Sequence, residues 1–489
     1  MINGYGKSDN RIVPEKPPNK ARAAEEVEGR RLAEGKPLKS NTCRTQGRES
    51  VTRGLERIRQ AANKDRRQRF TALFHHVYDV DQLRLAYLAL KREAAPGIDG
   101  ETWRQYGEGL EERLQDLSQR LKRGAYRANP VLRVYIPKRE GGQRPIGIPT
   151  LEDKIVQRAV AEVLGVIYDL DFLGFSYGFR PRRSVHQALD ALTVGILTKK
   201  VNWVLDADIR GFYDVLDHGW LVKFIEHRIA DRRIVRLIQK WLKAGVMEEG
   251  EQMQSEVGTV QGGSISPLLA NLYLHYVLDL WIQRWRKKQA QGDVIVVRWA
   301  DDFIVGFEHR WEGERFLTEL RERFEKFGLE LHPDKTRLIE FGRYARSNRA
   351  RRGEGKPETF DFLGFTHVCS ETKKGRFSVL RKTMQKRLQA KLKDVHTRLR
   401  RSMHHPVPEQ GKYLRSVILG HMRYYGVPGN RPSIAVFRKG VCWLWRKVLK
   451  CRSQKHRLNW DRMKRLIDRW LPTVYVCHPH PLVRFGVIT

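Results

Sequence analysis

Two adjacent carboxylates, Asp301 and Asp302, interrupt an otherwise apolar stretch of sequence, VIVVRWADDFIVGF at residues 294–307. The flanking runs are rich in β-branched residues, so the stretch predicts a tight hairpin with the two acids at its tip. Paired acids at such a tip are common in solvated turns. A functional role for the pair is indicated only together with Asp208, which follows another strand-like run in VNWVLDADIRGFYD, residues 201–214.

Three carboxylates from two strand ends are the ligands that a hard divalent cation prefers. Mg²⁺ binds oxygen and usually combines one or two protein carboxylates with substrate phosphates. In two-metal sites the ions lie roughly 3.5–4 Å apart and stabilise the attacking and leaving oxygens. Because neighbouring strand residues point to opposite faces, Asp301 and Asp302 cannot both bind from a regular strand. We expect Asp301 to be the direct ligand and Asp302 a weaker partner.

The charge of the chain indicates a polyanionic partner. Lys and Arg number 93 against 56 Asp and Glu, which gives a formal net charge of +37. This excess repels itself unless a polyanion neutralises it, so nucleic acid is the expected partner. Residues 381–470 contain 25 basic and 4 acidic residues and are expected to form a docking surface. Aromatic residues interleave there but are more often core than base-stacking groups, so none is assigned a stacking role: Tyr413, Tyr424, Tyr425, Trp443, Trp445, Trp460 and Trp470.

Cysteine usage and hydropathy give expectations about the compartment. No two of the five cysteines have CxxC spacing, so we expect reduced thiols rather than disulfides or a zinc module. No apolar run approaches the roughly 18 residues of a membrane span, and the N-terminus lacks a signal-peptide core. The sequence therefore predicts a soluble intracellular protein without a membrane partner.

The first half of the chain predicts a disordered extension followed by helices and a basic strand pair. Residues 1 to about 50 have almost no large apolar side chains and are expected to be disordered until bound. A basic helix is predicted from about residue 54, and another ends at Gly124. Residues 133–150 predict two short strands carrying Lys138, Arg139 and Arg144, although a merely solvated hairpin fits equally well. A helix should follow from 151 to about 168.

Three further segments complete the pattern. A Pro-containing loop places Arg180, Arg182 and Arg183 before a helix, which favours anion contacts. The Gly-rich sequence 258–274 predicts a loop presenting Gln261, then an apolar helix capped by Ser264 or Ser266. Residues 380–470 predict three or four basic amphipathic helices.

Taken in order, these blocks resemble the reverse transcriptase and maturase proteins encoded by bacterial group II introns. The likeness covers roughly residues 65–485 and depends on the ordered set of blocks: APGIDG, VYIPKREGGQRPIGIPTLEDKIVQRAV, FLGFSYGFRPRRSVHQAL, DADIRGFYDVLDH, GTVQGGSISPLLANLYL, RWADDF, LHPDKT and FDFLGF. The segments LGHMRYYGV and WLPTVYVCHPHPLVRF are similar to signatures of the family's maturase domain.

The resemblance implies an α+β right-hand polymerase fold. After the N-terminal extension, 1–50, it places the fingers and a palm with an antiparallel sheet in residues 51–370. A helical thumb and maturase domain that binds intron RNA should occupy 371–489. Many relatives end in a Cys- and His-containing DNA endonuclease that this sequence lacks, so we expect no second-strand cleavage by this chain.

The family's functional residues transfer to matching positions. Asp208, Asp301 and Asp302 resemble the catalytic triad, and the Ile209 carbonyl resembles an additional ligand for two Mg²⁺ ions. Tyr213 resembles the steric gate against ribonucleotides, although a core aromatic also fits its position. The remaining residues resemble groups around the nucleotide and the primer. Lys138 and Arg144 would hold the incoming triphosphate. Gln261 and Gly262 would shape the templating base pair, and Lys335 would lie near the primer or metal site.

Two positions depart from the family pattern. Trp299 stands where the aromatic residue before Ala-Asp-Asp is usually tyrosine, which removes a hydroxyl group and adds bulk. Val260 replaces the usual proline before Gln-Gly, which frees the backbone and restores an amide donor. Neither position is a metal ligand, so we expect activity to be retained.

The resemblance implies an RNA-directed DNA polymerase that uses dNTPs, binds its group II intron RNA and assists splicing. It should copy the intron at a DNA target and primer, in the bacterial cytosol and at the nucleoid. Two alternatives stay open at this point. One is a splicing-only cofactor with a decayed polymerase, and the other is a domesticated polymerase serving repair or defence. The sequence does not indicate the intron subclass or the oligomeric state.

Overall fold

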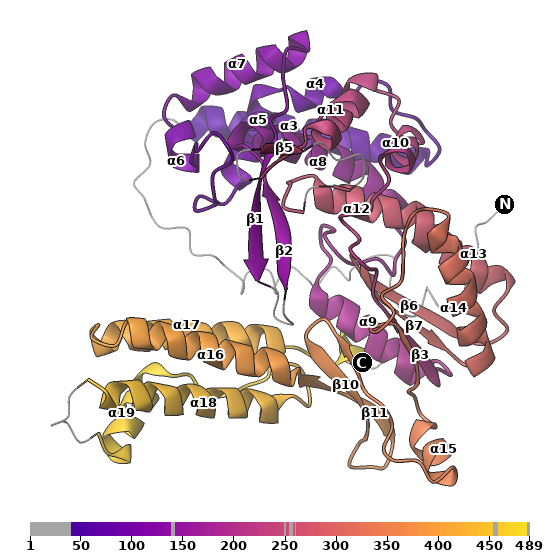
Figure 1. Cartoon of the computed structure of the whole chain (residues 1–489), viewed down its shortest axis with the longest axis vertical. Coiled ribbons are helices and arrows are strands. Elements are labelled where there is room, and N and C mark those ends of the chain that lie inside the picture. Colours follow the sequence, from indigo (N-terminus) through magenta and orange to yellow (C-terminus); the bar gives the residue numbers. More distant parts are fainter. Residues whose placement is uncertain are drawn as a thin grey trace.

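A computed structural model describes residues 41–137, 142–248, 251–253, 258–259, 261–452 and 458–486, and these form a mixed α/β structure. Figure 1 shows a helical body at the top, a β-sheet flanked by helices below it, and a bundle of long helices to one side. Lys138, Arg139 and Val260 lie outside the described residues. No described helix combines the length and apolar character needed to cross a membrane.

The helical body is built mainly from the N-terminal region. Its elements are α3 (Asn41–Lys64), α4 (Phe74–Val77), α5 (Val80–Ala89), α6 (Trp103–Tyr106), α7 (Leu110–Arg123), α8 (Leu151–Asp171), α10 (His218–Glu226) and α11 (Arg232–Lys243). Helix α7 ends as expected at Gly124, which has φ 77°. Helix α3 begins at Asn41, so the expectation of disorder was wrong for residues 41–50. Residues 1–40 lie outside the described part.

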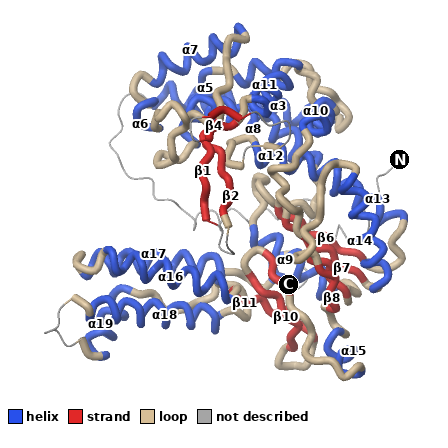
Figure 2. The backbone as a smooth tube through the Cα atoms, viewed as in Figure 1, coloured by secondary structure: helices blue, strands red, loops and turns tan. Residues whose placement is uncertain are grey.

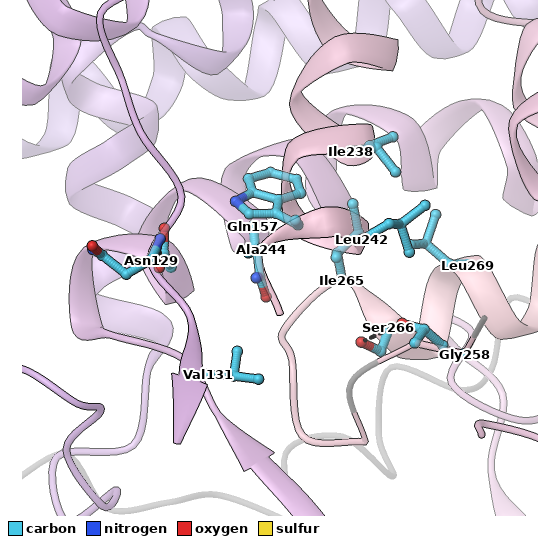
Figure 3. A pocket seen from close by; sticks show the side chains of 13 residues that line it. Asn129, Val131, Gln157, Ile238, Leu242, Ala244, Gly258, Ile265, Ser266 and Leu269 are labelled. Carbon is cyan, nitrogen blue, oxygen red and sulfur yellow. Dashed lines mark hydrogen bonds between the residues drawn. The ribbon is translucent and has the colours of Figure 1, made fainter. Parts of the chain in front are cut away.

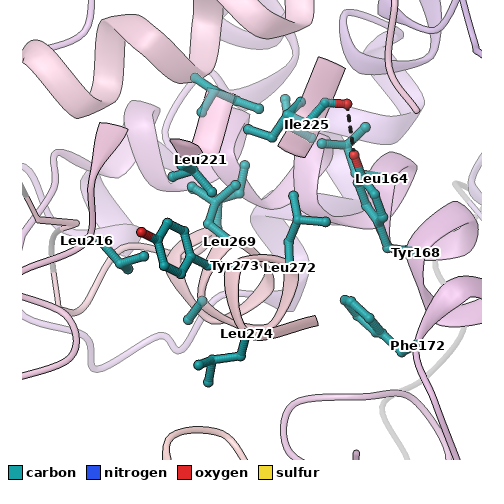
Figure 4. Packing of buried hydrophobic residues seen from close by; sticks show 14 of the residues in the cluster. Leu164, Tyr168, Phe172, Leu216, Leu221, Ile225, Leu269, Leu272, Tyr273 and Leu274 are labelled. Carbon is teal, nitrogen blue, oxygen red and sulfur yellow. Dashed lines mark hydrogen bonds between the residues drawn. The ribbon is translucent and has the colours of Figure 1, made fainter. Parts of the chain in front are cut away.

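Helix α8 anchors the core of this body. Figure 4 shows Leu164 and Tyr168 of α8, and Phe172 just after its end, facing apolar residues of α10 and α12 (Ser266–Leu274). The hydroxyl group of Tyr168 donates to the Ile225 carbonyl at 3.2 Å, which satisfies a fully buried polar group. These contacts place α12, and the loop that precedes it, directly against the body.

A β-hairpin arm projects from the body. Strands β1 (Val131–Pro137) and β2 (Gln143–Ile148) pair antiparallel, as the sequence predicts, with Ile136 opposite Arg144. At its base β1 also pairs in parallel with β4 (Val246–Glu248), which pairs with β5 (Glu251–Met253). Figure 2 shows the arm extending away from the helices toward the bundle.

The central sheet has strand order β6-β7-β3-β8, all antiparallel. Its strands are β3 (Trp203–Ala207), β6 (Val294–Trp299), β7 (Asp302–Phe307) and β8 (Arg337–Glu340). On β6, Val294 and Val296 pack with the core that includes α14 (Arg310–Glu325), while Ile295 and Val297 pack with α9 (Val185–Thr198). Because helices bury both faces, β6 is apolar without alternation.

Beyond the central sheet lie a smaller sheet and the helical bundle. Strands β9 (Phe360–Phe362), β10 (Phe365–Glu371) and β11 (Phe377–Thr383) follow α15 (Ala345–Arg351). The bundle contains α16 (Gln385–Arg401), α17 (Val407–Tyr425), α18 (Arg431–Lys450) and α19 (Trp460–Trp470), and short α20 (Pro481–Arg484) follows. The four helices agree with the sequence expectation. The domain boundary expected at 370/371 instead falls inside the β10–β11 hairpin.

Candidate active site

Asp301 and Asp302 lie at the tip of the β6–β7 hairpin, as the sequence predicts. Trp299 pairs with Asp302, so only Ala300 and Asp301 form the loop. Ala300 has φ 56°, which matches the positive φ that two-residue hairpin loops require at their first position. Asp301 therefore projects from the turn, and Asp302 is the first residue of β7.

Asp208 lies beside this tip because β3 is the neighbour of β7. Ala207 pairs with Phe303, so Asp208 comes one position beyond the end of the ladder, next to Asp302. Ile209 forms an antiparallel bridge with Leu331. The bonds of this bridge run from Arg210 N–H to the Glu330 carbonyl and from His332 N–H to the Asp208 carbonyl. Neither bond uses the Ile209 carbonyl.

Burial and neighbouring acidic residues raise the pKa values of Asp301 and Asp302. Burial raises the pKa of Asp301, and the nearby charge of Asp208 raises it further. Asp302 is reachable by solvent, yet dense protein packing around its carboxyl group raises its pKa to about 7, with further contributions from the other acids. Burial also raises the pKa of Asp206, two residues before Asp208 on β3, to about 7. Clustered carboxylates of this kind are stabilised by a cation among them.

The site already holds one cation against Asp208. Lys335 Nζ lies 3.0 Å from Asp208 Oδ2, with the lysine side chain about half exposed. Within the described ranges, no three acidic, histidine or cysteine side chains are close enough to enclose a metal ion by themselves. The donor set fits a divalent ion that takes one or two carboxylates and completes its shell with substrate phosphates and water.

Two further predicted residues lie within electrostatic reach of Asp301. Burial raises the pKa of Tyr213 to about 12, and the charges of Asp301 and Arg144 act on it in opposite directions. Arg144 is exposed on β2, and its charge also acts on Asp301. The structure thus brings together a carboxylate, an aromatic ring and a guanidinium group from three separate sequence blocks. Tyr213 is partly buried against the main core, so both alternatives for its role remain compatible with its position.

The Gln261–Gly262 loop is joined to the arm. The Gly147 N–H of β2 donates to the Gln261 carbonyl at 2.9 Å. Gly262 has φ 129°, and a Cβ there would clash with the Gly147 carbonyl oxygen. Gln157 of α8 fixes the other end of the loop by accepting from Ser264 N–H at 2.9 Å. The loop is therefore held between β2 and α8.

A pocket lies behind this loop, lined by side chains from the body and α12. Figure 3 shows Gln157, Ile265 and Ser266 around it. Asp153, on its wall, accepts from the hydroxyl groups of Tyr126 and Thr150. Gln157 is thus the buried residue of this wall that bonds the loop directly, while Asp153 joins the segments that carry Tyr126 and Thr150.

Replacing Gly262 with alanine is expected to slow primer extension, the activity that the family resemblance implies, by at least about tenfold. A left-handed backbone and a backbone clash each oppose the new methyl group. The measurement is steady-state extension of a DNA primer on RNA. Gly165→Ala is the matched control, since its Cβ would meet open space. Equal rates for the two variants would contradict a tight fit between the loop and β2.

The structure identifies one important residue that we did not predict, Arg298. Its guanidinium group is fully buried and binds Asp279 at 2.7 and 2.5 Å. It also donates to Asn271 Oδ1, Ser176 Oγ and the Ala300 carbonyl. An arginine within a strand that is apolar on both faces was the available signal. Its bond to Ala300 fixes the first residue of the hairpin loop that carries Asp301.

Two expectations from the sequence were wrong. Arg180 does not present its charge to an external anion, because it is buried, lies 2.9 Å from Asp169, and donates to the carbonyls of Leu173 and Ser176. Neither Ser264 nor Ser266 caps α12. Its N-cap residue is Ile265, and the Ser266 hydroxyl accepts from Thr259 instead.

Comparison with known proteins identifies the family of the chain. Residues 136–367 match the family model for reverse transcriptase (RNA-dependent DNA polymerase), so the chain contains an RNA-directed DNA polymerase domain. It is 35% identical to protein YkfC of Escherichia coli, over 51% of this chain and 74% of that protein. It is 38% identical to the group II intron-encoded protein LtrA of Lactococcus lactis, over 60% of this chain and half of that protein. The chain belongs to the family of group II intron reverse transcriptases and maturases.

Proposed function

We propose that the chain is a right-hand polymerase that copies RNA into DNA and also assists the splicing of a group II intron. The arm and helical body would be the fingers, the central sheet the palm, and α16–α18 the thumb. The observation that carries the proposal is the convergence of Asp208 with the Asp301–Asp302 tip in a chain of this family. The template and primer would lie between the arm and the bundle.

The proposed reaction is in-line attack of a primer 3′-hydroxyl group on the α-phosphate of a dNTP, with pyrophosphate leaving. Asp208, Asp301 and the Ile209 carbonyl would hold two Mg²⁺ ions, with Asp302 as a weaker partner. When bound, such ions supply activation of the attacking oxygen and charge neutralisation at the leaving oxygen. The protein's contribution is to position these groups on a rigid sheet.

The neighbouring residues would bind and orient the nucleotide. Arg144, with Lys138, would hold the triphosphate, since a guanidinium fork suits phosphate oxygens. Gln261 and Gly262 would contact the templating pair, in a loop whose position is fixed by β2. Lys335, now paired with Asp208, is close enough to the acids to contact the primer phosphate.

Substituting Tyr213 with alanine is expected to raise ribonucleotide incorporation relative to dNTP incorporation by at least about tenfold, a change of ~1.4 kcal/mol in relative barrier. The reason is that the ring lies beside Asp301 and Arg144, where a sugar 2′-hydroxyl would meet it. The ratio of kcat/KM values for rNTP and dNTP measures the effect. Tyr213→Phe keeps the ring and should keep the selectivity. If Tyr213→Phe loses as much selectivity as Tyr213→Ala, the proposed role of the ring as a steric gate is wrong.

The maturase role rests on the charge of the bundle region and on the family. We propose that the bundle binds the intron RNA and stabilises its folded form, and that the polymerase copies the intron at a DNA target. The 25 basic and 4 acidic residues at 381–470 provide the electrostatic attraction.

Splicing of a transcript from the surrounding locus at low Mg²⁺, with and without protein, tests this role. We expect acceleration by the wild-type protein and also by Asp301→Asn, because binding does not need the metal ligand. No acceleration would favour a domesticated polymerase. Acceleration without primer extension by the wild-type protein would favour a splicing-only cofactor.

A further inference from the structure

Helix α18 has two opposite faces with the same spacing and different chemistry. The buried face contains Ile434, Phe437, Val441, Trp445 and Val448. The residues two positions after each of these form an exposed face: Val436, Lys439, Trp443, Lys447 and Lys450. Both sets follow the 3–4 residue repeat of a helix. Trp443, at the centre of the second face, is 54% exposed.

A second exposed tryptophan adjoins this face. Trp460, the first residue of α19, is 51% exposed. The Arg446 guanidinium carbon lies 4.3 Å from the centre of the Trp460 ring, and Lys447 Nζ lies 5.5 Å from the centre of the Trp443 ring. Arg446 also donates to the Leu458 carbonyl at 3.4 Å, which fixes the start of α19 against α18. Each exposed indole ring thus lies against a cation, and the two cations are consecutive residues of α18.

The charge of α18 limits what this surface can bind. The helix carries six basic residues and no acidic residue in Arg431–Lys450. An apolar protein partner would leave these cations without counter-charges. A nucleic acid strand supplies phosphates for the cations and flat bases for the indole rings. A paired duplex hides its base faces, so the rings favour unpaired bases.

The surface is also separate from the proposed polymerase cleft. Figure 1 shows α16 and α17 between α18 and the β1–β2 arm. Helix α18 packs on α16 and α17 through its buried face, which leaves the Trp443 face pointing away from them. A strand bound here would therefore run along the outside of the bundle.

We propose that Trp443 and Trp460 stack on unpaired RNA bases while Lys439, Lys447 and Lys450 contact the phosphates. This proposal rests on the proposed function, because it names the part of the bundle that grips single-stranded segments of the intron RNA. The exposed α18 face is thus a second RNA site, outside the cleft.

Binding of oligouridylate of about 16 nucleotides tests the stacking role, with the cleft saturated by an annealed template–primer duplex. Trp443→Ala and Trp460→Ala should each weaken binding by roughly 5- to 100-fold, which is the usual range for one lost base stack. Trp443→Phe should restore most of the affinity. An abasic strand of equal length should bind wild-type and variant proteins equally, since it offers phosphates without bases.

The matched control is Trp311→Ala, which removes a tryptophan of similar exposure, 45%, from α14. It should leave oligouridylate binding unchanged. The proposal is overturned if the α18 variants bind oligouridylate as tightly as the control, or lose the abasic strand to the same degree. Markedly tighter binding of oligothymidylate than of oligouridylate by the wild-type protein would overturn the assignment to RNA. Failure of the wild-type protein to extend a primer would reject the polymerase proposal without changing these binding results.

Discussion

The Asp301→Asn variant is expected to lose primer extension by a factor of about 10³ or more while RNA binding stays within about twofold. The substitution removes a negative charge and a proposed metal ligand at the hairpin tip, but it removes no cationic contact to the RNA backbone. Single-turnover extension on an annealed RNA template and filter binding of the same RNA measure the two effects.

Asp116→Asn is the matched control for this experiment, because it makes the same chemical change on α7 at a side chain that is 64% exposed. This control should retain extension and binding. Parallel loss of both activities in Asp301→Asn would contradict the separation of catalysis from RNA binding. Retained extension in that variant would remove Asp301 from the catalytic site.

The Arg298→Met variant is expected to be destabilised by about 3–5 kcal/mol, because Asp279 would be left as an unpaired buried charge. Urea unfolding followed by fluorescence measures the loss. Extension should also fall, since the Ala300 carbonyl loses its donor and the hairpin loop is no longer fixed. Arg298→Lys keeps the charge but cannot reach all these acceptors, so it should fall between the wild type and Arg298→Met.

The double variant Arg298→Met with Asp279→Leu separates the stability effect from the positioning effect. Replacing both members of a buried ion pair with apolar residues is often neutral for stability. The double variant should therefore regain most of the lost stability but not the extension rate. Recovery of both would show that Arg298 acts only through folding.

The sequence predicted elements whose cause is local. The β6–β7 hairpin followed from two apolar runs around a short polar turn, and Gly124 ended α7 because a left-handed residue suits that position. The proximity of Asp208 to Asp302 was predicted because a divalent cation needs several carboxylate ligands. The structure explains it by the pairing of β3 with β7.

Errors arose where the path of the chain in three dimensions decides the outcome. Arg180 looked like an anion contact because Asp169 and two backbone carbonyls, its true partners, could not be identified from the loop alone. The boundary expected at 370/371 lies within β10, because the hairpin that β10 forms with β11 was not predicted. Arg298 was missed because its partner, Asp279, lies on a different element.

The two-residue loop between β6 and β7 has a consequence for how this protein can evolve. The ladder from Val294 to Trp299 leaves no spare residue, and helices cover both faces of the sheet. One inserted or deleted residue in either strand would exchange the two faces and shift the carboxylates out of line with Asp208. Homologous chains should therefore diverge in this segment by substitution alone, and tolerate changes in length only where the backbone leaves the sheet.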